Sequence, residues 1–307
     1  MEEVDKMSHR LRTCGAAAVL LLLLTLLSSC GQSAVQDETA TDYNQYIPSH
    51  GVTAYTKDLY IFFDSGRLFY VGRSQPSQLF PLCFQADCDH KNSSCTAWLN
   101  TPSRSIYAAG DNLYYIDADK DAKPALYRMD LSGGGRELVK SLNILNEESW
   151  PGISSLGYSF RVYGSYLAIE LNLLQEDSWQ HKIYLTGIDS KDEGVFLFGE
   201  EGDSDKSYIA IEFRENWLFV TEKNAADGTN TLWGYNFTTQ EAVPLVEGWD
   251  ISNCFTVQDG ILYWAVTGDG VYSMDMEKKS VTKHRSFDPV LEYGAAAYDD
   301  QYLYLTN

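Results

Sequence analysis

Basic side chains are scarce in this chain, which has 23 Lys and Arg residues against 43 Asp and Glu residues and a formal net charge of −20. Nucleic-acid binding depends on a concentrated basic surface, so this balance excludes a nucleic acid as a partner. It also excludes attachment to anionic lipid headgroups through surface charge. Residues 1–30 hold equal numbers of acidic and basic side chains, so their removal would leave the net charge unchanged.

Linear catalytic motifs are missing as well. The sequence has no Gly-x-x-x-x-Gly-Lys phosphate loop, no Gly-x-Ser-x-Gly nucleophile elbow and no His-Glu-x-x-His motif, so it indicates no catalytic residue. The segment 152–157 has the wrong spacing for a nucleophile elbow, and we predict a loop there. No long stretch has the 3.6-residue periodicity of a helix, which disfavours a helical fold.

Three aspartates alternate in one segment as the first ligands of a calcium loop would: Asp117, Asp119 and Asp121. Such a loop needs Gly where Ala122 stands and Glu where Arg128 stands. We therefore predict a solvated hairpin tip here, with calcium binding as the alternative.

The N-terminus has the pattern of an export signal. Basic residues precede an apolar run, 16–27, that is shorter than the about 20 residues a membrane-spanning helix needs. Leu27, two serines and Cys30 then resemble the lipobox of bacterial lipoproteins. The resemblance implies cleavage before Cys30, acylation of its sulfur and an extracytoplasmic protein anchored by lipid to the cell membrane. The alternative is an ordinary secretory signal in which Cys30 is incidental.

Residues 31–49 are mostly polar or small and predict a flexible tether between the signal peptide, 1–30, and a folded domain, 50–307. Aromatic residues make up 13% of the chain and cluster with aliphatic residues in short runs broken by Gly, Asp and Asn. Such runs are typical of β-strands joined by turns. The domain is therefore predicted to be all-β.

A turn followed by a short aromatic strand recurs six times, with its leucine at Leu59, Leu113, Leu167, Leu218, Leu262 and Leu303. A second aromatic strand, a polar turn and an apolar strand follow in most units, which predicts a four-stranded meander of about 40–54 residues, the size of a propeller blade. We expect a β-propeller of about six units, with a sandwich or a solenoid as the alternatives. The sixth unit lacks its outer strands, which suggests a truncated reading frame.

Two segments resemble known propeller families. Residues 126–131 (LYRMDL), before a glycine turn, are similar to the blade motif of low-density-lipoprotein-receptor-related proteins. Residues 81–90 (PLCFQADCDH), followed by Cys95 and Ala97, resemble a signature of uncharacterised propeller lipoproteins from Clostridia-like bacteria. These resemblances imply a propeller over most of the chain after the signal peptide and carry no particular activity.

Three cysteines and a histidine lie within thirteen residues as C-x4-C-x-H-x4-C: Cys83, Cys88, His90 and Cys95. Three thiolates and an imidazole are a ligand set that suits zinc in a closed structural site. Disulfides are the alternative, because these cysteines and Cys254 make an even number outside the cytoplasm. Free thiols are the third possibility.

Two classes of function remain open. A rigid ring of loops suits a non-catalytic module that binds a glycan, a peptide or a protein partner, and the missing catalytic motifs favour this class. The second class is a carbohydrate-active enzyme, a lyase or hydrolase, whose residues come from several blades and leave no linear motif. Fold alone does not decide between them.

The lipobox interpretation predicts the behaviour of a Cys30→Ser variant. The wild-type protein, expressed in a bacterium, should enter the detergent phase on phase separation, because acyl chains supply its membrane affinity. The variant should appear in the aqueous phase or stay unprocessed. Equal detergent partitioning of the two proteins would rule out acylation at Cys30.

Overall fold

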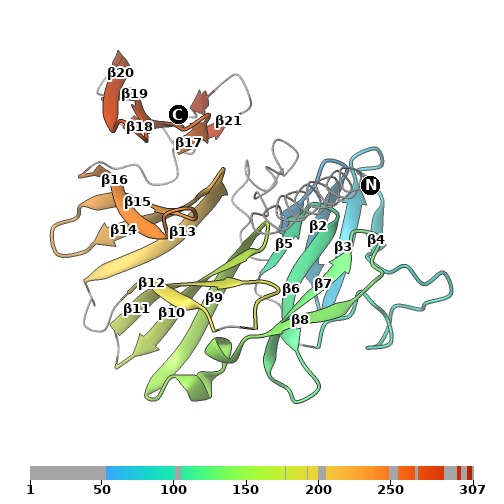
Figure 1. Ribbon diagram of the computed structural model, residues 1–307. Helices are drawn as coiled ribbons and strands as arrows, with labels where there is room; N and C mark the ends of the chain where they lie inside the picture. The colour runs from blue at the N-terminus through green and yellow to red at the C-terminus, as the bar shows by residue number, and fades with distance from the viewer. Residues whose placement is uncertain are drawn as a thin grey trace, which may run out of the picture. The chain divides into compact units, whose positions relative to one another are not determined.

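The computed structural model describes residues 53–100, 105–176, 178–191, 193–199, 205–248, 255–266, 269–286, 296–298 and 303–305. Within these ranges the chain is all-β, with five four-stranded antiparallel sheets, one two-stranded sheet and two short 3-10 helices (Figure 1). The predicted signal peptide with Cys30, the tether and Cys254 lie outside the described residues. No helix in the described part of the chain is long and apolar enough to cross a membrane.

We number the sheets 1 to 6 in chain order. Sheet 1 contains β1 (Thr53–Tyr55), β2 (Leu59–Asp64), β3 (Arg67–Gly72) and β4 (Leu79–Pro81). Sheet 2 contains β5 (Ile106–Ala109), β6 (Asn112–Ala118), β7 (Pro124–Asp130) and β8 (Glu137–Ser141), followed by the 3-10 turns Asn143–Leu145 and Glu147–Ser149. Sheet 3 contains β9 (Ile153–Tyr163), β10 (Tyr166–Gln175), β11 (Ser178–Gly187) and β12 (Val195–Phe198).

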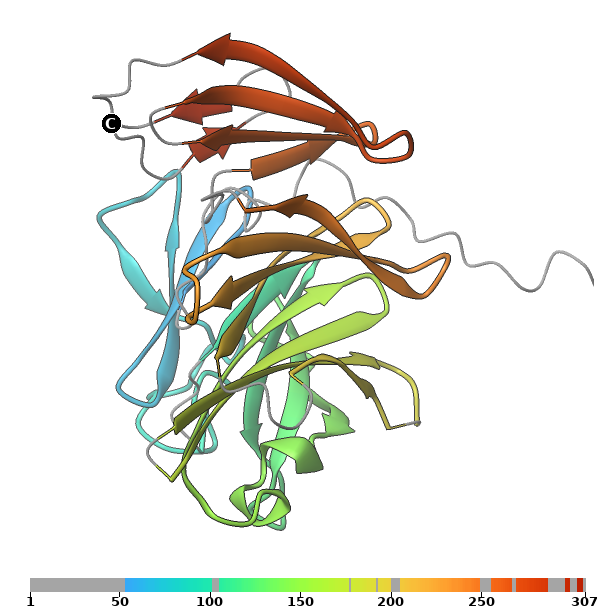
Figure 2. The same cartoon turned by 90° about the vertical axis from the view of Figure 1, so that its left-hand side faces the viewer.

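Sheet 4 contains β13 (Lys206–Arg214), β14 (Trp217–Asn224), β15 (Asn230–Asn236) and β16 (Glu241–Glu247). Sheet 5 contains β17 (Phe255–Gln258), β18 (Ile261–Val266), β19 (Gly270–Asp275) and β20 (Ser280–Ser286), which lie side by side in Figure 2. Sheet 6 pairs β21 (Ala296–Tyr298) with β22 (Leu303–Leu305). Every sheet is a meander in chain order, which is the arrangement of strands in propeller blades.

The predicted repeat is confirmed at the level of strands. Each repeated leucine falls in the second strand of its sheet, and the second aromatic element forms the third strand of sheets 1 to 5. The leucines of sheets 2 to 5 are fully buried: Leu113, Leu167, Leu218 and Leu262. In sheets 2 to 5 the repeat therefore marks the strand that carries apolar side chains into the core.

The prediction of a loop at residues 152–157 is wrong, because β9 begins at Ile153. Apart from Ser154, residues 153–157 pair with the long apolar strand β10, where Leu156 lies opposite Leu173 and Gly157 opposite Asn172. Cross-strand pairing with an apolar partner thus prevails over the low strand preference of Gly and Ser.

Consecutive sheets bury their faces against each other. One apolar cluster joins sheets 1 and 2 around Ile61, Leu68 and Leu113, and a second joins sheets 2 and 3. Stacked rings link sheets 3 and 4, such as Tyr163 on Phe213, and a third cluster joins sheets 4 and 5. A single meander cannot cover both of its own faces, so this packing is what lets each sheet fold.

Polar contacts add to two of these junctions. Lys140 of β8 donates from Nζ to Thr186 Oγ1 at 2.9 Å, to the Gly187 carbonyl at 3.1 Å and to the Ser190 carbonyl at 2.7 Å, which ties sheet 2 to sheet 3. Glu215 accepts a hydrogen bond from the Gly260 backbone N–H at 3.2 Å, which ties sheet 4 to sheet 5. These bonds help to fix the position of each sheet against its neighbour.

The turn between β7 and β8 touches the segment that follows β4. Gly133 has a φ of +85°, and a Cβ there would lie 2.5 Å from the Leu82 carbonyl oxygen. Asp130 holds this turn by accepting hydrogen bonds from the Ser132 and Gly134 backbone N–H groups. Sheet 2 therefore contacts the connection between sheets 1 and 2 through backbone that only glycine allows.

This contact predicts that Gly133→Ala destabilises the protein more than Gly228→Ala does. Gly228 also has a positive φ, +71°, but a Cβ there would meet nothing within 4 Å. The control variant, Gly228→Ala, should lose about 1–2 kcal/mol of unfolding free energy to backbone strain. Gly133→Ala should lose the same amount and roughly 1–3 kcal/mol more, because its Cβ overpacks the contact with Leu82. Urea unfolding of both variants measures the difference. Equal losses would show that the turn can move away from Leu82.

Candidate metal centre

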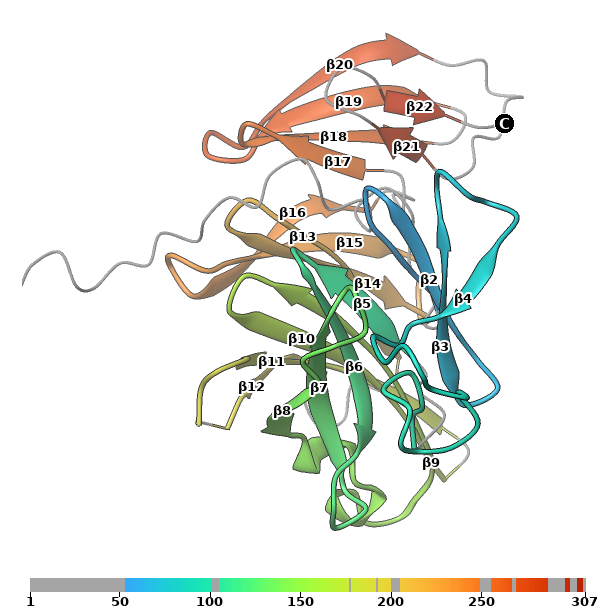
Figure 3. The same ribbon diagram turned by 90° about the vertical axis from the view of Figure 1, so that its right-hand side faces the viewer.

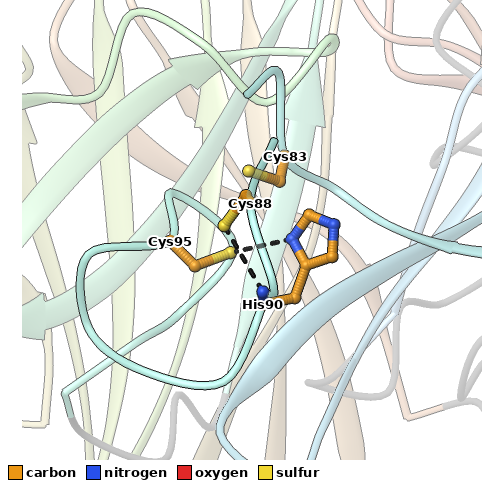
Figure 4. Close-up of side chains that lie close together, drawn as sticks. All are labelled: Cys83, Cys88, His90 and Cys95. Carbon is orange, nitrogen blue, oxygen red and sulfur yellow. Dashed lines mark hydrogen bonds between the residues drawn. The ribbon is translucent and has the colours of Figure 1, made fainter. Parts of the chain in front are cut away.

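The Cys/His cluster lies in the connection between β4 and β5, which folds into turns beside β3 (Figure 3). Figure 4 shows the three sulfur atoms and the His90 ring gathered around one point. The ligand atoms of Cys83, Cys88, His90 and Cys95 all lie within 4.8 Å of one another. The structure thus brings together all four residues that the spacing singled out.

Backbone pairing to β3 explains why the two ends of the loop meet. The Leu82 N–H donates to the Leu68 carbonyl at 2.9 Å, and the Leu68 N–H donates to the Ala97 carbonyl at 2.9 Å. One residue of β3 therefore holds both flanks of the loop, and it places Cys83 beside Cys95. A further bond, from the Leu99 N–H to the Gly66 carbonyl at 3.0 Å, extends this pairing.

Tight turns bring the remaining ligands inward. The Cys88 N–H donates to the Gln85 carbonyl and the Cys95 N–H to the Asn92 carbonyl, so both cysteines close a turn. His90 has a φ of +55°, a left-handed conformation that His adopts more readily than most residues. Its carbonyl accepts a hydrogen bond from Arg67 Nη1 at 3.2 Å, which holds this reversed backbone against β3.

The distances suit tetrahedral coordination. His90 Nδ1 lies 3.3 Å from Cys95 Sγ, and the His90 backbone N–H donates to Cys88 Sγ at 3.4 Å. Ligand atoms of a tetrahedral zinc with Zn–S of about 2.3 Å and Zn–N of about 2.0 Å lie roughly 3.5–3.8 Å apart. The four ligand atoms are at most 4.8 Å apart, so binding of the metal would draw the most widely separated of them closer by up to about 1 Å. No two of these three cysteines are bonded to each other.

The thiols differ in how readily they ionise. Burial opposes ionisation of Cys83, but hydrogen bonds from Thr96, from the backbone of Gln85 and from Cys95 outweigh it and lower the pKa of Cys83 to about 6. Burial, together with the neighbouring Cys88 and Cys83, raises the pKa of Cys95 to about 12. At neutral pH the cluster thus holds one thiolate, Cys83, beside one protonated thiol, Cys95. A cation that displaces the proton of Cys95 would offset the repulsion between the two thiolates.

The cluster is covered on one side only. Cys95 is 1% exposed and belongs to the apolar cluster of sheets 1 and 2, together with Leu82, Ala97 and Leu99. The other three ligand residues are partly buried, and residues 84–87 and 91–94 are exposed. All four ligand positions come from the chain, as in a structural site, and no open position for a substrate is evident.

A buried ion pair, which the sequence did not predict, holds the C-terminal end of the loop at Trp98 and Asn100. Asp117 is 1% exposed and contacts Arg136 Nη2 at 2.5 Å, so it does not belong to a solvated hairpin tip as predicted. Arg136 Nη1 donates to the Trp98 carbonyl at 3.0 Å, and the Asn100 N–H donates to Asp117 at 3.1 Å. The pattern of alternating aspartates concealed this role, because Asp119 is only partly buried and Asp121 is exposed, as expected of a hairpin tip.

No protein-family model matches the chain, and no curated protein matches its sequence. Solved structures match at low identity. An oligogalacturonate lyase in complex with manganese matches with a TM-score of 0.45 and 14% identity over 75% of this chain and 62% of that one. A structure from a study of two prolyl endopeptidases matches with a TM-score of 0.51 and 12% identity over 85% and 40%. TolB from Acinetobacter baumannii matches with a TM-score of 0.40 and 15% identity over 83% and 55%.

These likenesses concern the fold. The match above a TM-score of 0.5, to the prolyl endopeptidase structure, covers most of this chain and shows that its repeated β-sheets occur in a known architecture. The chain spans less than two thirds of each of these neighbours. Their activities are properties of those proteins.

Proposed function

We propose that this chain is an extracytoplasmic lipoprotein whose β-propeller serves as a binding module, held to the cell membrane by acylation of Cys30. The observation that carries the proposal is the packing of five consecutive four-stranded sheets through apolar clusters, stacked rings and polar contacts such as those of Lys140. Such packing supplies a rigid frame for loops, which is what a binding surface needs. The charge of −20 disfavours adsorption to anionic lipid, so the acyl chains attached at the lipobox cysteine would have to supply the membrane affinity.

Zinc is the proposed occupant of the Cys/His cluster, and its role is structural. Three sulfur atoms and one imidazole nitrogen are the softest set of metal ligands in the described chain. The distances between these ligand atoms approach those of a tetrahedral zinc site. The metal would lock the loop that contributes Leu82, Ala97 and Leu99 to the core of sheets 1 and 2. Zinc binding then stabilises the junction between the first two sheets.

Metal analysis tests this role. Protein purified without chelator should contain about one equivalent of zinc, and three thiols of the cluster should react once the protein is denatured. Cys88→Ser should carry much less zinc and melt at lower temperature, roughly 2–4 °C lower for each kcal/mol lost. Ser93→Ala, an exposed change in the same loop, is the control and should match the wild type. Absence of both metal and reactive thiols would identify disulfides instead.

A second candidate, a carbohydrate-active lyase or hydrolase, is favoured by one observation. His181 contacts Asn172, which donates to Glu170, so an imidazole and a carboxylate belong to one hydrogen-bonded chain on sheet 3. General acid–base chemistry uses such groups. No nucleophile or second acid is defined beside them among the described residues, so we rank this candidate below the binding module.

A ligand screen separates the two candidates. The full chain, purified in detergent micelles, is presented with arrays of glycans and peptides and with host proteins, and bound material is recovered and examined for cleavage. The binding module predicts saturable capture of a ligand that is recovered unchanged. Recovery of shortened or unsaturated saccharides, lost in a His181→Ala variant, would favour the enzyme.

A further inference from the structure

The end of the hairpin between β10 and β11 projects past the outer strand of sheet 3. Strands β9, β10 and β11 have 11, 10 and 10 residues, whereas β12 has four and pairs only with Ile183, Tyr184 and Leu185. Gly199, which follows β12, still lies against the backbone of His181 and Lys182 and accepts a hydrogen bond from Lys182 Nζ at 2.6 Å, so the described outer neighbour of β11 stops short of residues 178–180.

One face of sheet 3 carries a row of hydrogen-bonded polar groups, which runs from Ser159 and Glu170, at the level of Ile183, to His181. Ser159 Oγ lies 3.4 Å from Glu170 Oε2, and Asn172 Nδ2 lies 3.3 Å from Glu170 Oε1. His181 Nδ1 lies 2.5 Å from Asn172 Oδ1. These residues face each other across three strands, because Ser159 pairs with Glu170 and Asn172 pairs with His181.

The row fixes the orientation of the imidazole. Asn172 donates through its amide nitrogen to Glu170, so its oxygen faces His181 and accepts the proton on Nδ1. Burial lowers the pKa of His181, which keeps the ring neutral at physiological pH. The lone pair of His181 Nε2 then points away from the row, and no described residue makes a hydrogen bond with it. The face thus presents an oriented acceptor.

An exposed indole adjoins this acceptor. Trp179 is 47% exposed and lies two residues before His181 on β11, so its side chain is on the same face about 7 Å away. Gly157 lies opposite Asn172 in the neighbouring strand and has no side chain to cover the row. The result is a shallow surface with a flat apolar ring at one end and polar groups at the other.

We propose that this surface, formed by Trp179, His181, Asn172 and the space over Gly157, binds a neutral glycan. The indole stacks against the C–H face of a pyranose ring, while His181 Nε2 accepts a hydrogen bond from a ring hydroxyl. The charge of −20 and the exposed carboxylate of Glu176 oppose the binding of acidic sugars, so uncharged glycans are the ligand class. This inference rests on the proposed binding function and names its ligand and site.

Calorimetric titration of the full chain in detergent micelles tests the site. The probes are hexasaccharides of β-1,4-glucan, β-1,4-xylan, β-1,4-mannan and α-1,4-glucan, with oligogalacturonate as the acidic comparison. At least one neutral probe should bind at one site per chain. Trp179→Ala should weaken that binding at least tenfold, and Gly157→Leu should do the same by filling the space. Val281→Ala, an exposed apolar change on β20, should leave it unchanged.

Three outcomes overturn the inference. Failure of all neutral probes to bind removes the ligand class, and binding that Trp179→Ala leaves intact removes the site. Binding of oligogalacturonate in preference to the neutral probes removes the charge argument. In each case, capture of a peptide or protein in the ligand screen would leave the binding module standing. Unfolding midpoints and zinc content equal to the wild type confirm that each variant is folded.

Discussion

The fold depends on the need of every meander sheet to cover two apolar faces. A four-stranded meander, here with strands of 3 to 11 residues, cannot cover both of its own faces, so each sheet relies on its neighbour in sequence. The apolar clusters shared by sheets 1 and 2, 2 and 3, and 4 and 5 meet this need, and stacked rings meet it between sheets 3 and 4. Loops, turns and candidate sites are all placed by these junctions.

The sequence was sufficient to predict the repeated pattern of strands that this constraint requires. The repeated leucines mark the second strands because burial at that position recurs in sheets 2 to 5, and short aromatic runs separated by polar turns mark the strand boundaries. The Cys/His set was also predictable, because four ligand types within thirteen residues stand out against a chain with few other cysteines. Both signals can be read along the chain without knowing which distant segments meet in the fold.

Contacts between distant segments left no such signal. Lys140 reaches carbonyls of sheet 3, Arg136 reaches Asp117 and Trp98, and His181 joins Asn172 across a strand pair. Each of these residues could equally be a solvated surface side chain when read from the sequence alone. Pairing with β10 likewise made a strand of residues that look like a loop at the start of β9. Such features are fixed by tertiary context.

The junction between sheets 1 and 2 shows why a metal would be useful at the Cys/His cluster. Strands β1 and β4 have three residues each, and the fully buried residues that sheet 1 contributes to the shared apolar cluster are Ala54, Ile61 and Leu68. The loop contributes more buried residues than that, namely Leu82, Cys95, Ala97 and Leu99. A loop that supplies core side chains must be held in one conformation, yet its exposed turns have little apolar surface of their own to stabilise it. Pairing to Leu68 holds its two flanks, the Arg136 ion pair holds its far end, and a cation bound to the four ligands would hold the part between them.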